Sequence, residues 1–266
     1  MAHDSPALSP ARNASSWLRG VGRVSASLAV ITTFAFLAPA AADAATYPPG
    51  PAGSGNLSQW RANPHTVVAD CAIGPVGRRV LVVGDSITSR TKDVLTSTLT
   101  AAGWSVCIDS QPGQPTWYAL DNFKTDGSFP AYVDVIVMAT GSNDIFDPTR
   151  LAAQVQRART YAGTRPMLWV NVFVHRSGAN ASYRSHDLLN SAKVNRLLVN
   201  RYGWRFVTAT VDWSGVLTRR PARQATHLVD GVHTTVTGGA VRSALIAQSL
   251  APYLPEPTDE GDPLQR

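Results

Sequence analysis

Lysine is scarce in this 266-residue chain, although the chain as a whole is basic. Of its 24 lysine and arginine residues only Lys92, Lys124 and Lys193 are lysines, and the net charge of +6 is modest and spread out. No run of basic residues alternates with aromatic residues, as it does in many nucleic-acid binding surfaces. We therefore expect no nucleic acid among the partners of this protein.

Long apolar runs are equally scarce. The one candidate, 24–38, follows Arg19 and Arg23 and precedes the small-residue pattern Ala42-Asp43-Ala44, an arrangement typical of a cleaved secretory signal. It is shorter than the roughly 20 residues that span a bilayer, and no second run is long enough to do so. We predict a bacterial Sec-type signal over 1–44, an extracytoplasmic mature protein and no membrane span after cleavage. The alternative is an uncleaved membrane anchor.

Cysteine occurs only twice, at Cys71 and Cys107. Neither lies at the predicted cleavage site, which argues against a lipid-anchored protein. Because oxidising compartments favour disulfides and the count is even, we predict a Cys71–Cys107 bridge. The alternative is a pair of buried thiols.

Several motifs of common enzymes are absent as well. The sequence has no Gly-x-Ser-x-Gly elbow, no glycine-rich phosphate loop that ends in lysine, and no His/Cys set with the spacing of metal ligands. We therefore expect neither a metal nor an organic cofactor.

With 44% hydrophobic residues the chain can bury one substantial core. A Pro/Gly-rich flexible segment is predicted over 45–70, a single folded domain over 71–254 and a charged, disordered tail over 255–266.

Within the domain, short apolar runs alternate with segments of helical period, which predicts an α/β fold with a parallel sheet covered by helices. The predicted strands are 79–83, 104–108, 133–138, 167–174 and 205–209. Helices are predicted between Ser86 and Gly103, at 117–123, from Pro148 onward, at 188–199 and at 237–253. The polar stretches 175–186 and 219–227 are expected to be loops that shape a binding site.

Polar or glycine-bearing segments follow the predicted strands. Ser86 follows the first strand, Gly113 the second and 141–144 the third, while 230–233 precedes the last helix. Because ligands bind at the carboxyl ends of parallel strands, we expect these segments to meet at one edge of the sheet.

A serine hydroxyl becomes a nucleophile when a base removes its proton, and histidine is the usual base. We predict that Ser86 is the nucleophile, His233 the base and Asp230 the carboxylate that orients His233. The alternative for Asp230 and His233 is an Asx-type turn that leads into a helix.

Acyl transfer also needs hydrogen-bond donors for the developing oxyanion. The candidates are the backbone N–H groups of Ser86 and Gly113 and the side-chain amide of Asn143. An ordinary turn is the alternative for Gly113, and a helix cap is the alternative for Asn143. Asp85 and Asp144 adjoin these residues, and we expect them to form local hydrogen bonds rather than bind a cation.

These residues together resemble the four sequence blocks of the SGNH/GDSL hydrolases. Ser86 stands in the first block as Gly-Asp-Ser, Gly113 in the second, Asn143 in the third as Gly-Ser-Asn-Asp, and Asp230 with His233 in the last. The resemblance covers about Arg79 to Leu254. It implies a three-layer α/β/α flavodoxin-like fold with a five-stranded parallel sheet, and a carboxylic ester hydrolase that works through an acyl-enzyme.

Three stretches also resemble the extracytoplasmic SGNH domains of bacterial cell-wall O-acyltransferases. They are 108–114, 170–174 and 230–235. This chain has no multi-span membrane domain, so we expect a free-standing, secreted, monomeric esterase that acts on an acylated small molecule, glycan or lipid and can associate with the cell wall. The alternatives are a cell-wall O-acyltransferase with the same catalytic residues and a non-catalytic glycan-binding module.

Overall fold

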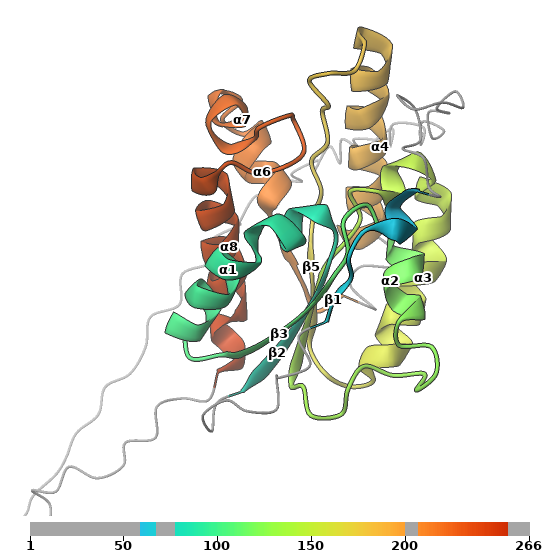
Figure 1. The fold of residues 1–266 in the computed structure, drawn as a ribbon, viewed down its shortest axis with the longest axis vertical. Helices are drawn as coiled ribbons and strands as arrows, with labels where there is room; N and C mark the ends of the chain where they lie inside the picture. The colour runs from blue at the N-terminus through green and yellow to red at the C-terminus, as the bar shows by residue number, and fades with distance from the viewer. Residues whose placement is uncertain (1–58, 68–77, 200–206, 255–266) are drawn as a thin grey trace, which may run out of the picture. The chain divides into compact units, whose positions relative to one another are not determined.

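The computed structural model describes residues 59–67, 78–199 and 207–254, which form a six-stranded sheet with helices on both faces (Figure 1). The strands lie in the order β1 (Thr66–Val67), β3 (Ser105–Ser110), β2 (Arg79–Gly84), β4 (Val135–Ala139), β5 (Met167–Val170) and β6 (Ala209–Val211). β1 pairs antiparallel with β3, and the other five strands are parallel. The predicted five-stranded parallel sheet is confirmed, with β1 as an additional edge strand.

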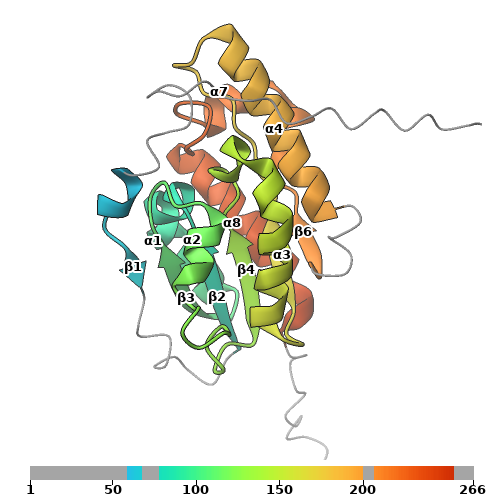
Figure 2. The same cartoon turned by 90° about the vertical axis from the view of Figure 1, so that its right-hand side faces the viewer.

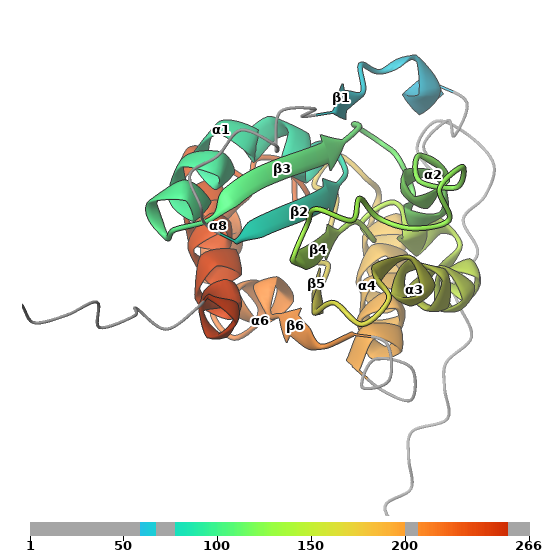
Figure 3. The same ribbon diagram turned by 90° about the horizontal axis from the view of Figure 1, so that it is seen from below.

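The core lies on both faces of the sheet, because successive residues of a buried strand point to opposite sides. In β2, Val80 and Val82 belong to one apolar cluster, and Leu81 and Val83 belong to the other. The first cluster is covered by α1 (Ser86–Ala101), α6 (Trp213–Thr218) and α8 (Val236–Leu250). The second is covered by α2 (Thr116–Asp121), α3 (Pro148–Ala162) and α4 (Ala181–Val199). Figure 3 shows the two groups of helices on opposite sides of the sheet.

Four shorter elements complete the described residues. They are η1 (Gln59–Ala62), η2 (Asp144–Phe146), α7 (Ala222–His227) and η3 (Ala251–Tyr253). α7 packs against α6 and α8, at the end of the domain that also carries the start of α4 (Figures 1 and 2).

Two predicted loops contain helices. α4 begins at Ala181 instead of 188, and the stretch expected as a loop over 219–227 contains α7. In the first half of α4 the buried side chains are polar, with Asp187 and Asn190 fully inaccessible. A search for apolar periodicity does not detect such a helix, because its inner face forms ion pairs and hydrogen bonds instead of apolar contacts.

The structure also differs from the predicted flexible segment 45–70 over residues 59–67. There η1 and β1 pack along the edge of the sheet, where Asn63 donates a hydrogen bond to Pro112 O (2.8 Å) and its own backbone oxygen accepts one from Gln111. These contacts hold the segment against the loop that follows β3.

Several sequence predictions fall on residues outside the described ranges. They concern the signal over 1–44, the tail over 255–266 and the Cys71 side of the disulfide. Cys107 is fully buried in β3, and its bridge to Cys71 stays a prediction. Among the described residues, no helix combines the length and the apolar character that a membrane crossing requires.

Candidate active site

The candidate site lies at the topological switch point of the parallel sheet, where the strands that follow β2 in sequence are added first on one side of it and then on the other. β2 is central, with β3 on one side and β4 on the other. Ser86 follows β2, Gly113 follows β3 and Asn143 follows β4. Segments that leave neighbouring strands in opposite directions open a crevice between them, which is the usual ligand site of such sheets. The three predicted residues therefore meet at one edge of the sheet.

Ser86 occupies a tight turn from β2 into α1. Asp85 caps the helix, because its Oδ1 accepts a hydrogen bond from the N–H of Ile87 (3.0 Å). As the first residue of α1, Ser86 has a backbone N–H without a partner inside the helix. Gly84 lies so close to Thr88 that an added Cβ would come within 2.2 Å of its hydroxyl oxygen. Only glycine fits at this position.

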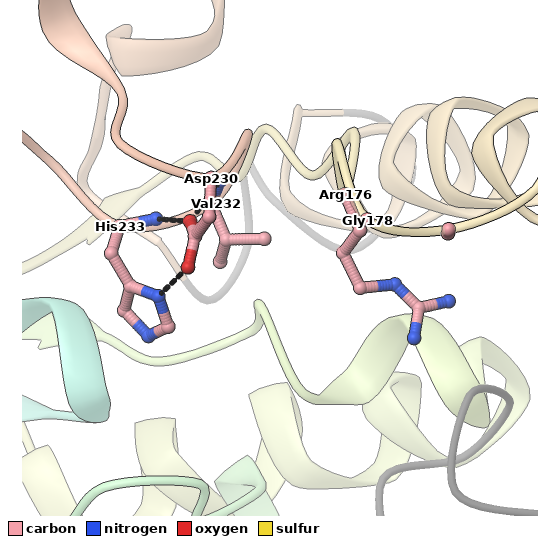
Figure 4. A pocket seen from close by; sticks show the side chains of 6 residues that line it. Arg176, Gly178, Asp230, Val232 and His233 are labelled. Carbon is pink, nitrogen blue, oxygen red and sulfur yellow. Dashed lines mark hydrogen bonds and ion pairs between the residues drawn. The ribbon is translucent and has the colours of Figure 1, made fainter.

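His233 connects Ser86 to Asp230. Its Nε2 lies 2.9 Å from Ser86 Oγ, and its Nδ1 lies 2.7 Å from Asp230 Oδ2. Figure 4 shows the second contact, together with the bond from the His233 backbone N–H to Asp230 Oδ1. The three side chains therefore form one continuous chain of hydrogen bonds.

Asp230 remains a carboxylate in this arrangement. Burial opposes its ionisation, but the hydrogen bonds from His233 and from backbone N–H groups outweigh burial and lower its pKa below the ordinary value. An ionised Asp230 can accept the Nδ1–H of His233, which leaves Nε2 free to accept the proton of Ser86.

The turn that carries Asp230 and His233 docks on the loop after β5. His175 N–H donates to Gly231 O (2.9 Å), and Ser177 N–H donates to Asp230 O (2.8 Å). Gly231 has φ +85°, and an added Cβ would come within 1.8 Å of His175 O. The turn is held by backbone contacts that require glycine, so it is more than an Asx turn at the start of α8.

The three candidate oxyanion donors line one cavity of about 350 Å³ with His233. They are Ser86, Gly113 and Asn143. Gly113 has φ +83°, a conformation that favours glycine. Asn143 precedes η2, but its side chain does not cap that helix and instead donates to Gln114 O (3.1 Å). An Asn side-chain nitrogen carries two N–H groups, so one remains for a ligand.

Gln114 is a residue that the sequence analysis did not single out. It is fully buried, its side-chain nitrogen donates to Gly84 O, and its backbone oxygen accepts from Asn143. It thus joins the strand end before Ser86 to the amide of Asn143. No pattern distinguishes such a glutamine from others in strand-end loops.

Asp85 and Asp144 form the local hydrogen bonds that were predicted. Asp144 Oδ2 accepts from the backbone N–H (3.0 Å) and the hydroxyl (2.7 Å) of Thr116 at the start of α2. Burial raises the pKa of Asp144 to about 6 despite these bonds. Burial also raises the pKa of Asp85, against the opposing effects of the Ile87 N–H and the charge of Arg242.

A neighbouring cavity of about 310 Å³ shares Arg176, Val232 and His233 with the first. Figure 4 shows the Arg176 side chain and the His233 ring on the same side of the two segments that carry them. Arg176 forms an ion pair with the fully buried Asp187 (2.8 Å), so its charge is compensated within the protein.

No protein-family model matches the sequence, and no curated protein matches it at a significant level. Solved structures do resemble it. A GDSL-like lipase from Bacteroides thetaiotaomicron is 16% identical, with a TM-score of 0.56 over 75% of this chain and 98% of its own. A lipase/acylhydrolase from Enterococcus faecalis is 17% identical, with a TM-score of 0.51 over 68% and 99%.

The C-terminal catalytic domain of peptidoglycan O-acetyltransferase A from Streptococcus pneumoniae, solved with a methylsulfonyl adduct, is also similar. It is 19% identical, with a TM-score of 0.50 over 68% of this chain and 98% of that domain. At these identities the similarity establishes the fold. The chain therefore has the three-layer α/β/α fold of the SGNH/GDSL hydrolases.

Proposed function

We propose that the protein is a serine esterase that hydrolyses carboxylic esters through an acyl-enzyme. The observation that carries the proposal is the hydrogen-bond chain from Ser86 through His233 to Asp230, with contacts of 2.9 and 2.7 Å. Its fold, shared with lipases and acylhydrolases, supports the same reaction class.

In the first half of the reaction Ser86 Oγ attacks the ester carbonyl carbon, and its proton passes to His233 Nε2. The carbonyl oxygen becomes an oxyanion, which the N–H groups of Ser86, Gly113 and Asn143 stabilise. Each such donor contributes about 3 kcal/mol to lowering the barrier in comparable sites. Collapse of the intermediate breaks the ester bond, and His233 gives its proton to the leaving alkoxide.

In the second half water attacks the acyl-enzyme. His233 Nε2 removes a proton from the water as its oxygen bonds to the carbonyl carbon, and then returns this proton to Ser86 Oγ. The products are a carboxylic acid, an alcohol and the regenerated serine. Asp230 stays ionised throughout and stabilises the imidazolium form of His233.

Hydrolysis of p-nitrophenyl acetate tests this proposal. Ser86→Ala and His233→Ala should each abolish hydrolysis without loss of the folded state, as judged by circular dichroism. Ser97→Ala, which removes an exposed serine from the same helix, serves as the control and should keep wild-type activity. Retained hydrolysis in Ser86→Ala would overturn the mechanism.

A second candidate function is O-acyl transfer to a cell-wall glycan. It is supported by the similarity to the peptidoglycan O-acetyltransferase domain, and it needs only a sugar hydroxyl in place of water. Mass spectrometry of a muropeptide incubated with the protein and an acyl donor separates the two. Release of free acid without an acylated muropeptide supports hydrolysis, and an acylated muropeptide supports transfer.

We also propose that the protein acts outside the cytoplasm, on the basis of the signal-like segment 1–44. N-terminal sequencing of protein recovered from the culture medium should begin at Ala45 or a neighbouring residue. Recovery of the intact chain only in the membrane fraction would contradict this.

A further inference from the structure

We propose that Arg90 binds a carboxylate on the substrate, so that the site selects esters with a negative charge near the scissile bond. This inference rests on the proposed esterase function and adds a substrate class to it. It follows from the position of Arg90 relative to Ser86, from the ion pairing of the arginines in the cavity and from the charges of the other lining residues.

Arg90 lies four residues after Ser86 on α1. Residues four apart lie on the same face of a helix, and helical side chains lean toward the helix N-terminus, so the Arg90 side chain extends toward Ser86. Arg90 and Ser86 also line the same cavity, together with His233 and the oxyanion candidate Asn143. A guanidinium group therefore borders the space in which the ester must lie.

The charge of Arg90 is available to a ligand. Its side chain is exposed, and within 59–67, 78–199 and 207–254 it has neither an ion pair nor a side-chain hydrogen bond. Arg176 lines the same cavity but donates to both carboxylate oxygens of Asp187. Of these two cations, only Arg90 lacks a partner in the described structure.

Among the described residues, the wall of the cavity carries no acidic side chain. Its described lining residues include Arg90, Arg176 and His233 but no aspartate or glutamate. Asp85 and Asp144 lie nearby but are buried and do not line the cavity. The N-terminus of α1 adds a partial positive charge at the same place. Asp230 lines the adjoining cavity and pairs with His233, and Asp187 pairs with Arg176. Arg90 is therefore the cation of this cavity whose charge no carboxylate of the described residues balances.

One free guanidinium suits one carboxylate. Arginine and a carboxylate match in geometry, because two N–H groups can bind the two oxygens in parallel. A phosphate monoester carries more negative charge and would need further donors. A single Arg90 therefore favours a carboxylate-bearing ester.

Three esters test the inference. p-Nitrophenyl acetate is neutral, p-nitrophenyl hemisuccinate carries a carboxylate on its acyl side, and the acetate of a carboxylated nitrophenol carries one on its alcohol side. For each ester, kcat/KM is measured in the wild type and in Arg90→Gln, and the wild-type value is divided by that of the variant. This ratio removes the difference in intrinsic reactivity between esters. Arg78→Gln is the control, because Arg78 is exposed and precedes β2, at the opposite end of the strand from Ser86.

We expect the loss of kcat/KM in Arg90→Gln to be about tenfold larger for one of the anionic esters than for the neutral ester. High salt should diminish this difference, because the site is exposed. Arg78→Gln should show no such difference. The ester that responds identifies the acyl or the alcohol side as the one that carries the charge.

Two results would overturn the inference while leaving the esterase proposal intact. In the first, Arg90→Gln lowers kcat/KM equally for all three esters, as a general structural defect would. In the second, it lowers kcat/KM for none of them although Ser86→Ala is inactive. If the wild type hydrolyses no ester faster than Ser86→Ala does, the esterase proposal fails and the inference fails with it.

Discussion

The side-chain nitrogen of Gln114 donates a hydrogen bond to the backbone oxygen of Gly84, two residues before Ser86. Because the backbone oxygen of Gln114 also accepts from Asn143, this buried residue links the turn that carries Ser86 to the side-chain amide of Asn143, a candidate oxyanion donor. The relative position of Ser86 and Asn143 therefore depends on a glutamine that need not touch the substrate.

Gln114→Ala should lower kcat about tenfold or more with little change in KM, since a small misalignment of reacting groups is costly. A destabilisation of about 1 kcal/mol is expected too, because Gly84 O loses the shorter of two hydrogen bonds and keeps the one from Gln111 N–H (3.4 Å). Steady-state kinetics well below the melting temperature separate the two effects. Gln156→Ala, an exposed glutamine on α3, controls for the substitution. An unchanged kcat in Gln114→Ala would exclude the positioning role.

Asn143→Ala should reduce kcat by about 10²- to 10³-fold, the typical cost of one oxyanion donor. The expected loss lies mainly in kcat, because the charge on the carbonyl oxygen develops only in the transition state. A loss confined to KM would mean that Asn143 binds the ground state instead.

Asp144→Asn should stabilise the protein in a pH-dependent way. The pKa of Asp144 is about 6 in the folded protein and 3.8 ordinarily. Below pH 3.8 the carboxyl is protonated in both the folded and the unfolded state, so it does not change the free energy of unfolding. As pH rises toward 6, only the unfolded chain releases this proton, and the stability of the wild type falls. The variant lacks this loss, which is on the order of 3 kcal/mol above pH 6.

Urea unfolding of wild type and Asp144→Asn across this pH range provides the measurement. The stability of the variant relative to wild type should rise between pH 4 and 6 and then level off. A difference that does not vary with pH would show that burial does not raise the pKa of Asp144.

His65 should stabilise the edge segment at low pH. Its Nε2 lies 3.0 Å from Asp109 Oδ1, and this hydrogen bond raises the pKa of His65 against the effect of burial. The stabilisation is fully present below pH 6.5, the ordinary value, and is lost as pH rises through the raised value in the folded state.

The melting temperatures of wild type and His65→Gln should therefore differ most at low pH and converge as pH increases. A difference that grows with rising pH would contradict the ion pair. Residues 59–67 also contact the loop that contains Gly113, because Asn63 donates a hydrogen bond to Pro112 O. Measuring kcat of His65→Gln alongside shows whether the edge segment also affects the candidate site.

The centre of the sheet was predictable because β2, β4 and β5 are largely apolar. β2 and β4 are buried on both faces, and such runs indicate strands of a covered parallel sheet. The meeting of Ser86, Gly113 and Asn143 followed from their places after three strands. The contact of His233 with Ser86, 147 residues away, followed from chemistry, since a serine nucleophile requires a base.

Other features depended on tertiary contacts that no local pattern reveals. The polar first half of α4 packs through the pairing of Asp187 with Arg176, in a stretch that reads as a polar loop. β1 has only two residues and exists because it pairs with the edge of β3. The role of Gln114 likewise depends on two backbone neighbours that are distant in sequence.

Acid-quenched peptide mapping can locate the acyl group that the proposed mechanism places on Ser86. The wild-type protein is mixed with a slowly hydrolysed p-nitrophenyl ester, quenched in acid and digested, and the acyl group is located by mass spectrometry. The proposed mechanism predicts an acyl group on Ser86 in the wild type and none in His233→Ala. An acyl group on another residue, or turnover without any covalent intermediate, would contradict it.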